Sequence, residues 1–438
     1  MNAKVLTATC ACGFALVMAA AAAFGEQRPG SDDRRLFARA ELAAIYRHSP
    51  LGEPTSDAAD GVAAGARAAR LGQALFFERR FSADGSVSCA TCHAPEKAFA
   101  DGRRVGVGLE PGERNTPSLL NAAFNRWFFW DGRADTLWAQ ALGPIENAKE
   151  FGGDRLHALK VVAENPPLRR AYEEVFGPLP PLEDAQRFPR HAFPDSDPQS
   201  PAALAWAGMV PADQDAVNRG YANLGKAIEA YERKLASGDS AFDRYVAALK
   251  KGDLAAQRAY PAAAKRGLKL FAGKGQCELC HSGPAFSDGA FHNIGLPVLD
   301  GKSSDLGRAS GIGVVRASVF NALGPYSDNP AGEAKDRLVY LPSPRSQLGS
   351  FKTPGLRNVA LTAPYMHDGR FGTLQAVLGF YAKGSAGSKG GKPVGSREAT
   401  LDLVPHLSAA QMDDLVAFLK TLTGAPVSPE LSRPPAAP

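Results

Sequence analysis

Two short cysteine–histidine motifs constrain this chain more than any other feature. Cys89-Ala-Thr-Cys92-His93 and Cys277-Glu-Leu-Cys280-His281 both read C-x-x-C-H. Two thiols on one turn can add to the two vinyl groups of one porphyrin, and the adjacent histidine then faces the iron as its proximal ligand. We therefore predict two covalently bound haem c groups, attached through Cys89, Cys92, Cys277 and Cys280 and ligated by His93 and His281.

Other uses of paired cysteines fit this pattern less well. A zinc ribbon places two C-x-x-C pairs about 15–20 residues apart, but these motifs are 188 positions apart (277 − 89) and each has its own histidine. A thioredoxin-type redox pair belongs to a βαβ pattern, which the surrounding sequence lacks. The other two cysteines, Cys10 and Cys12, lie in the N-terminal segment, so the motifs account for every cysteine of the expected mature protein.

The first 25 residues have the pattern of a secretory signal peptide. Lys4 precedes an apolar, alanine-rich run over residues 5–23, and small residues up to Gly25 offer a cleavage zone. An uncleaved membrane anchor is the alternative, but the run has few large aliphatic side chains. Haem c is attached outside the cytoplasm, so export also suits the motifs. We expect a periplasmic protein with no stable membrane insertion.

The composition is typical of a globular chain and argues against one class of partner. The 438 residues carry 50 basic and 45 acidic side chains, a formal net charge of +5. This excess is too dilute, and too free of long Lys/Arg runs, to indicate nucleic-acid binding. It suits at most a mild attraction to an acidic partner protein.

The two motifs stand in repeated surroundings. Thr116–Leu137 aligns without a gap on Thr353–Leu374 at a constant offset of 237 (353 − 116), and ten of these 22 positions are identical. Leu71–Phe76 precedes the first motif and Leu268–Phe271 precedes the second. Helical and loop patterns dominate, and alternating β patterns are scarce. We therefore expect a mainly α fold of two tandem cytochrome c-like haem domains, related by internal duplication and carrying long loops.

The two copies differ at positions that bear on the chemistry of each haem. Trp130 of the first copy is aligned with His367 of the second, and Pro144 is aligned with Tyr381. Proline has no atom that can bind iron, whereas tyrosine has a phenolic oxygen. The alignment therefore predicts an open first haem and a closed second one. The alternative for Tyr381 is an aromatic core residue at helical spacing.

The positions of the histidines agree with this asymmetry. No histidine lies between His93 and His157, so no nearby one can cap the first haem. His48 has polar and proline-containing surroundings and is expected at the surface. His367 lies in a duplicated turn near the second motif, and we favour a structural role for it over a role as a metal ligand.

Four segments resemble the bacterial dihaem cytochrome c peroxidase/MauG superfamily, and the likeness extends over most of the mature chain. They are Arg114–Pro117, Phe129–Arg133, Phe351–Asn358 and Ala363–Gly369. The resemblance implies an oxidoreductase that reacts with hydrogen peroxide at the first haem and passes electrons to it from the second. It also implies either a small c-type cytochrome or cupredoxin as electron donor, or a protein substrate.

Position by position, the resemblance implies roles for four residues of the first half. Trp130 corresponds to a tryptophan that relays electrons between the two haems. Gln140 and Glu150 match the distal glutamine and glutamate of the peroxidatic pocket, and Pro144 matches the distal proline of MauG. A carboxylate beside an open iron site can move a proton between the two oxygens of a peroxide.

The resemblance also implies metal ligands. Tyr381 falls at the position of the sixth ligand of the second haem iron. Asn115 and the backbone carbonyls of Thr362 and Pro364 match ligands of a Ca²⁺ ion between the haems, and such oxygen donors suit that hard ion. Without the resemblance, Asn115 and Pro364 would be read as simple turn residues.

Two departures from typical cytochrome c peroxidases bear on the activity. Those enzymes usually carry a distal histidine on the first haem, and this chain lacks one there. They also carry a methionine at the position of Tyr381, where MauG has a tyrosine. Met366 lies fifteen residues earlier, and the family pattern does not place it as the ligand. Two activities stay open, namely MauG-like oxidation of a protein side chain and reduction of peroxide by cytochrome c. A non-catalytic electron-transfer cytochrome is the alternative from another class.

The same patterns suggest limits for the parts of the chain. We expect an N-terminal peroxidatic domain over 34–250, a C-terminal electron-transfer domain over 251–425 and a disordered tail over 426–438. The proline- and aspartate-rich segment at about 177–215 and the segment 300–348 look like insertions, and both are expected to form surface loops.

Overall fold

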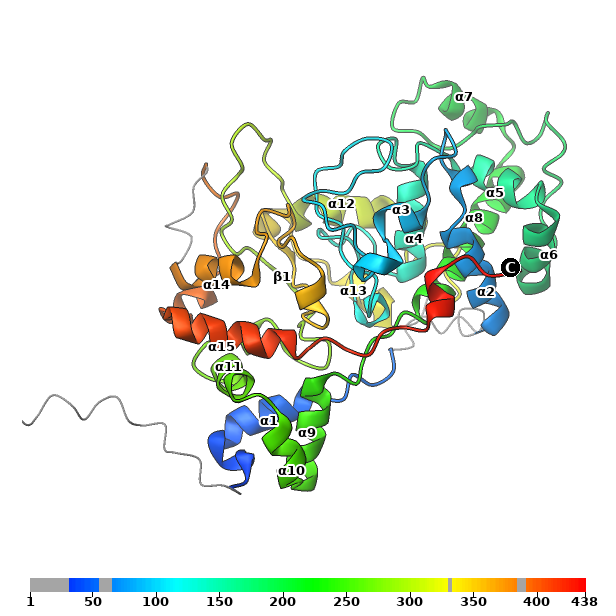
Figure 1. Ribbon diagram of the computed structural model, residues 1–438. Coiled ribbons are helices and arrows are strands. Elements are labelled where there is room, and N and C mark those ends of the chain that lie inside the picture. Colours follow the sequence, from blue (N-terminus) through cyan, green and yellow to red (C-terminus); the bar gives the residue numbers. More distant parts are fainter. Residues whose placement is uncertain (1–30, 55–64, 330–332, 384–390) are drawn as a thin grey trace, which may run out of the picture.

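The computed structural model describes residues 31–54, 65–329, 333–383 and 391–438, and the fold is mainly helical, as predicted (Figure 1). The expected signal peptide at 1–25 lies outside these residues. The helices up to the middle of the chain are α1 (Arg39–Arg47), α2 (Ala66–Phe76), α3 (Cys89–Cys92), α4 (Leu137–Glu146), α5 (Arg155–Ala163), α6 (Pro166–Phe176), α7 (Pro201–Gly208) and α8 (Pro211–Glu232). The later elements are α9 (Ala241–Lys251), α10 (Leu254–Ala259), α11 (Ala262–Ala272), α12 (Arg308–Ala317), α13 (Glu333–Val339), α14 (Leu374–Lys383), α15 (Ala409–Lys420) and two short strands, β1 (Phe291–His292) and β2 (Phe351–Lys352).

The first half packs around the long helix α8. Helices α2, α4 and α5 all contact α8. Glycines let the backbones approach closely, because a Cβ at Gly72 would lie 1.7 Å from the Ala227 carbonyl oxygen, and one at Gly225 would lie 2.4 Å from the Trp138 carbonyl oxygen. This packing fixes two helices on α8, namely α2, which precedes the first haem motif, and α4, which carries Gln140 and Pro144.

The second half repeats this close packing of helices at a glycine. Helix α11, which precedes the second motif, packs on α15, and a Cβ at Gly267 would lie 2.0 Å from the Asp414 carbonyl oxygen. Gly267 stands four residues before Phe271, just as Gly72 stands four residues before Phe76. Each half therefore seats the helix before its motif on a later helix through a glycine at the same position.

Backbone turns recur at the aligned positions as well. Asn121 and Asn358, separated by the offset of 237, have φ values of 63° and 62°, and a short 3₁₀ helix follows each of them. Phe129 and Met366, separated by the same offset, have φ values of 61° and 72°. Left-handed residues other than glycine are uncommon, so their recurrence supports the internal duplication.

The packing corrects the predicted domain limits. Phe37 and Ile45 near the N-terminus, together with Phe242 and Tyr245 of α9, are buried in one apolar core with Phe418 of α15. Figure 1 accordingly shows α1, α9 and α10 beside α11. The second half therefore includes the chain segment of α1, before the first haem motif, and helix α9, which ends at residue 251. An apolar stripe marks the buried face of a helix, but it does not identify the partner.

The C-terminal residues also differ from the predicted disordered tail. They cross back to the first half (Figure 1), where a 3₁₀ helix spans Pro429–Ser432. Tyr231 donates its hydroxyl to the Leu431 carbonyl at 2.5 Å, and Gln73 Nε2 donates to the Glu430 carbonyl at 2.6 Å. The end of the chain is therefore tied to α2 and α8, the helices that support the first motif.

Neither predicted insertion is a simple surface loop. Leu179, Phe188 and Ala192 of the segment 177–215 are buried in the core of the first half. The segment 300–348 forms α12 and α13, and Ile312 and Val315 of α12 pack in a small core with Trp127 of the first half. The second segment therefore fastens the two halves together.

Candidate functional site

A cavity of about 790 Å³ lies between the two halves. Its size is within the range of ligand and cofactor sites. The second half contributes Phe351, Lys352 and His367 to its wall. The predicted site residues of the first half that line it are Cys92, His93, Asn115, Trp130, Gln140, Pro144 and Glu150. One cavity thus gathers the first motif, the predicted pocket and the predicted relay.

Both motif histidines are oriented in the same way. His93 Nδ1 lies 3.2 Å from the Phe99 carbonyl oxygen, and His281 Nδ1 lies 3.0 Å from the Phe286 carbonyl oxygen. A ring whose Nδ1–H donates to a carbonyl presents a neutral Nε2 to a metal. Burial lowers the pKa of both imidazoles, which favours the neutral form that can bind iron.

The motif cysteines are free thiols rather than disulfides. Burial raises the pKa of Cys92 to about 11 and that of Cys277 to about 12. The thiolate is the nucleophile in thiol–disulfide exchange, so these buried thiols are poorly suited to a dithiol redox centre. Paired thiols beside an oriented histidine instead fit attachment of a porphyrin at each motif.

His48 supports the second motif, although the sequence suggested a surface position. The residue is fully buried, and its ring stacks on Phe286 with a centroid separation of 4.2 Å. Its Nδ1 lies 2.7 Å from the Gly283 carbonyl oxygen. Phe286 carries the carbonyl that orients His281, so His48 braces that turn. The contact joins residues more than 230 positions apart, and no local pattern indicates it.

Helix α4 and the turn after it carry the predicted pocket residues. Gln140 and Pro144 lie one helical turn apart, and Pro144 has no N–H to donate to the Gln140 carbonyl. Glu150 Oε1 accepts a hydrogen bond of 2.7 Å from Asn147 Nδ2. Burial raises the pKa of Glu150, and Arg133 opposes this shift. A carboxyl with a raised pKa is poised to exchange protons.

Trp130 lies at the seam between the halves. Its indole Nε1 donates to the Asn115 carbonyl at 2.9 Å, and its own carbonyl accepts from the Lys352 amide at 2.9 Å. The Asn115 amide in turn donates to the His367 carbonyl at 2.7 Å. Both halves therefore position the predicted relay residue.

Arg308 is a site residue that the sequence did not indicate. It is buried, with its guanidinium 4.0 Å from the ring centroid of Trp127 and 4.2 Å from that of Phe291. Its Nη1 donates to the Gly132 carbonyl at 2.5 Å. Arg308 thus holds the turn that follows Trp130. The sequence did not indicate this role, because Arg308 lies in a segment that was expected to be an insertion.

Tyr381 lies near the second motif. Burial raises its pKa, and the neighbouring thiols of Cys280 and Cys277 raise it further. His367, by contrast, stacks on Phe351 with a centroid separation of 3.6 Å and faces the cavity between the halves. Tyr381 is therefore near enough to interact electrostatically with the second motif, and its role as an iron ligand stays a prediction.

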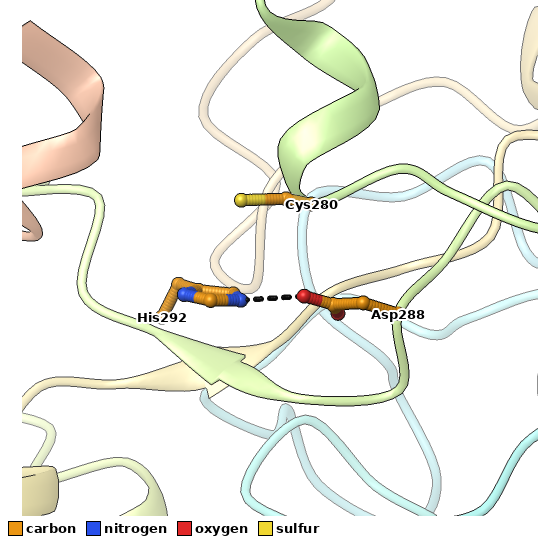
Figure 2. A group of neighbouring side chains, drawn as sticks. All are labelled: Cys280, Asp288 and His292. Carbon is orange, nitrogen blue, oxygen red and sulfur yellow. Dashed lines mark hydrogen bonds and ion pairs between the residues drawn. The ribbon is translucent and has the colours of Figure 1, made fainter. Parts of the chain in front are cut away.

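Cys280, Asp288 and His292 bring three atoms of metal-ligand type within 4.8 Å of one another (Figure 2). His292 Nε2 lies 2.8 Å from Asp288 Oδ2, and its Nδ1 lies 3.3 Å from Glu398 Oε2. A ring that donates from both nitrogens has no lone pair for a metal, and thioether formation would use the Cys280 sulfur. We interpret the group as a hydrogen-bonded edge of the second haem site.

The predicted calcium ligands are only partly brought together. The Asn115 amide bonds to His367, in the turn that follows Pro364. Asn115 Nδ2 donates to the Arg103 carbonyl at 2.9 Å, which leaves Oδ1 available to a cation. Among the described residues, none donates a hydrogen bond to the carbonyl of Thr362 or Pro364. These oxygen donors fit a hard cation, and the site stays a prediction.

The fold and the paired attachment turns define the chain as a dihaem redox protein, and comparisons give its family. Residues 66–251 match the model of the di-haem cytochrome c peroxidase family. The chain is 34% identical to methylamine utilization protein MauG of Methylorubrum extorquens, covering 83% of this chain and 80% of the relative. It is 32% identical to cytochrome c551 peroxidase of Pseudomonas aeruginosa, covering 81% and 78%. The chain therefore belongs to the di-haem cytochrome c peroxidase/MauG family.

Solved structures agree with this family. The diheme peroxidase BthA from Burkholderia thailandensis matches with a TM-score of 0.60 and 25% identity over 88% of this chain and 94% of that one. A MauG-like protein associated with microbial copper homeostasis matches with a TM-score of 0.58 and 26% identity over 89% and 97%. In the part of the chain that the structure describes, no helix is both long enough and apolar enough to cross a bilayer.

Proposed function

We propose that the protein is a periplasmic dihaem oxidoreductase in which hydrogen peroxide reacts in the first-half pocket and electrons arrive from the second half through Trp130. The observation that carries this proposal is the shared cavity, which brings His93, Glu150 and Trp130 together. Export follows from the expected signal peptide at 1–25. Asn115, Thr362 and Pro364 are the proposed ligands of one Ca²⁺ ion.

The chain's own residues fit two haems. Cys89 and Cys92 would hold the first through thioether bonds with His93 as iron ligand, and Cys277, Cys280 and His281 would hold the second. A bound haem supplies the iron at which peroxide is reduced and the means to store oxidising equivalents. The peptide carbonyls of Phe99 and Phe286 orient the two imidazoles for this role.

Glu150 is the proposed proton carrier. Reduction of hydrogen peroxide to two water molecules consumes two electrons and two protons from outside the peroxide. Cleavage of the O–O bond also requires the peroxide's own proton to leave one oxygen and reach the other. Asn147 holds Glu150 Oε1, so Oε2 is available to accept that proton and return it. Gln140 and Pro144 line the same cavity. There Gln140 can orient the peroxide, and Pro144 keeps the iron side free of a protein ligand.

The first prediction concerns cofactor load. The wild-type protein should carry two haems per chain, because each motif pairs two thiols with an oriented histidine. A pyridine haemochrome assay and intact mass measure this number directly. A variant with Cys277→Ser and Cys280→Ser should lose one covalent haem. A wild-type mass with one haem, or with zinc in place of haem, contradicts the proposal.

The second prediction concerns Trp130. Trp130→Phe should leave peroxide binding intact and uncouple the second haem, because it removes the indole that lies at the seam of the two halves. The indole Nε1 bonds to the Asn115 carbonyl, and the Trp130 backbone carbonyl bonds to the Lys352 amide of the second half. Rapid-mixing spectra should then show oxidation confined to the first haem. Trp206→Phe, on α7, is the matched control. If both haems of Trp130→Phe oxidise together at the wild-type rate, the relay role is wrong.

Two reactions share this site. The chain is similar in sequence to both MauG and cytochrome c551 peroxidase. Two reactions are therefore candidates, namely oxidation of a protein side chain and reduction of peroxide by a small cytochrome or cupredoxin. The position of Tyr381 beside the second motif favours the MauG-like reaction, since a phenolate stabilises higher oxidation states than the methionine of typical peroxidases. Peroxide turnover measured with reduced cytochrome c and with candidate protein substrates discriminates between them.

A purely electron-transferring cytochrome is the competing class. It requires both irons to be six-coordinate and gives Glu150 no role. The spin state of the resting ferric protein tests this directly. One high-spin haem supports the enzyme, whereas two low-spin haems that ignore peroxide support the electron-transfer cytochrome.

A further inference from the structure

Lys352 occupies a fixed position at the seam of the molecule. Its strand β2 pairs antiparallel with β1, placing Lys352 opposite Phe291. Its backbone amide donates to the Trp130 carbonyl at 2.9 Å, and Lys352 is one of the residues that line the cavity with His93. Lys352 therefore places a cationic residue of the second half at the wall of the cofactor site of the first.

Three arginines of the same cavity wall are paired with aspartates, and the fourth, Arg104, is exposed to solvent. Arg114 Nη1 lies 2.6 Å from Asp131 Oδ2, and its Nε lies 2.8 Å from Asp305 Oδ2. Arg133 contacts Asp131 at 3.2 Å, and Arg370 contacts Asp368 at 2.5 Å. These cations are neutralised by the protein itself.

Lys352 is different. Among the described residues, no hydrogen bond or ion pair reaches its ammonium group, although burial lowers the pKa of Lys352 to about 8. The side chain is half-buried, and a partly desolvated cation without a protein partner is costly, so such groups are normally paired with an anion. The cavity-lining residues Lys149 and Lys302 are exposed to solvent and have no such requirement.

We propose that Lys352 Nζ is the counter-charge for a propionate carboxylate of the haem carried by His93, beside Trp130. Thioether attachment uses the vinyl groups, so the two propionates are the anions that this cofactor retains. The inference rests on the proposed haem at the first motif, and it adds a binding residue supplied by the opposite half. The same lysine ties Trp130 to the cofactor edge through its backbone amide.

The charge has a measurable consequence. A cation beside a propionate stabilises the reduced iron, which carries one positive charge less than the ferric iron. Lys352→Met should therefore shift the ferric–ferrous equilibrium of the first haem toward ferric by about tenfold, which is ~59 mV for one electron. Lys352→Arg keeps the charge and should stay near the wild-type potential. Lys302→Met, an exposed lysine of the same cavity, is the matched control and should also stay near it.

Redox titration of the fully loaded proteins, with the two haems followed by their separate absorption bands, tests the inference. A first-haem potential in Lys352→Met equal to that of the wild type overturns it. Resonance Raman spectra provide a second readout, because the propionate bending mode should differ between the wild type and Lys352→Arg. An identical mode in both also overturns the contact. A different result would contradict the proposed function, namely a wild-type protein that does not react with peroxide. That result does not depend on the reduction potentials measured for the Lys352 variants, so the two failures can be told apart.

Discussion

Glu150→Gln is expected to slow the reaction with hydrogen peroxide by about 10²–10⁴-fold, the usual contribution of a positioned acid–base group. Glutamine keeps the size of the side chain and can still contact Asn147, but its amide cannot accept the peroxide proton. Haem spectra and haem load should therefore stay unchanged. Stopped-flow mixing of the ferric protein with peroxide measures the rate.

The pH dependence of this rate carries a second signature of Glu150. Burial raises the pKa of the carboxyl above its ordinary value of 4.5. Glu150 accepts the peroxide proton only when it is ionised. The wild-type rate should therefore fall as the pH drops through this raised pKa, and the fall should be missing in Glu150→Gln.

The control for Glu150 comes from the same cavity. Glu110 lines it too but is exposed to solvent, so Glu110→Gln should react at nearly the wild-type rate. Equal rates for wild type and Glu150→Gln would show that the proton carrier is another group. A loss of haem in Glu150→Gln would instead indicate a structural role.

The attachment sites could be predicted from the sequence because their chemistry lies within a few residues. The C-x-x-C-H spacing specifies two thiols and a histidine on one turn, and the carbonyl that orients each imidazole follows five or six residues later. The offset of 237 likewise aligned turns that the structure repeats, such as those at Asn121 and Asn358. Local spacing carries this information with no knowledge of the tertiary fold.

Other features depend on contacts between distant segments, which local spacing does not encode. The apolar stripe of α9 indicates a buried face, yet only the assembled fold shows that Phe242 packs with Phe418 of the second half. Arg308 bonds to the Gly132 carbonyl across 176 positions. His48 was expected at the surface and instead braces Phe286. In each case the partner, and therefore the role, is set by tertiary packing.

Tyr381 is the residue whose replacement should change the second haem most. The offset of 237 aligns it with Pro144 of the open first pocket. The structure places it on α14 close enough to Cys277 and Cys280 for their thiols to raise its pKa, after the larger effect of burial. The main competitor, His367, lines the cavity between the two halves and stacks on Phe351. Tyr381 is therefore the better-placed candidate for the sixth iron ligand.

The resting ferric protein should accordingly show one high-spin haem and one low-spin haem, and it should react with peroxide without prior reduction, because no ligand must first leave the open site. Tyr381→Phe removes the phenolic oxygen and should abolish the wild-type low-spin signal in electron paramagnetic resonance. Tyr381→Met should restore a low-spin haem with a higher potential, since a thioether ligand raises it. Tyr365→Phe is the matched control, because the Tyr365 hydroxyl bonds to the Val359 carbonyl at 3.0 Å and should not affect the iron. An identical low-spin signal in the wild type and Tyr381→Phe would remove Tyr381 from the iron, and with it the reason to prefer oxidation of a protein side chain over reduction of peroxide by cytochrome c.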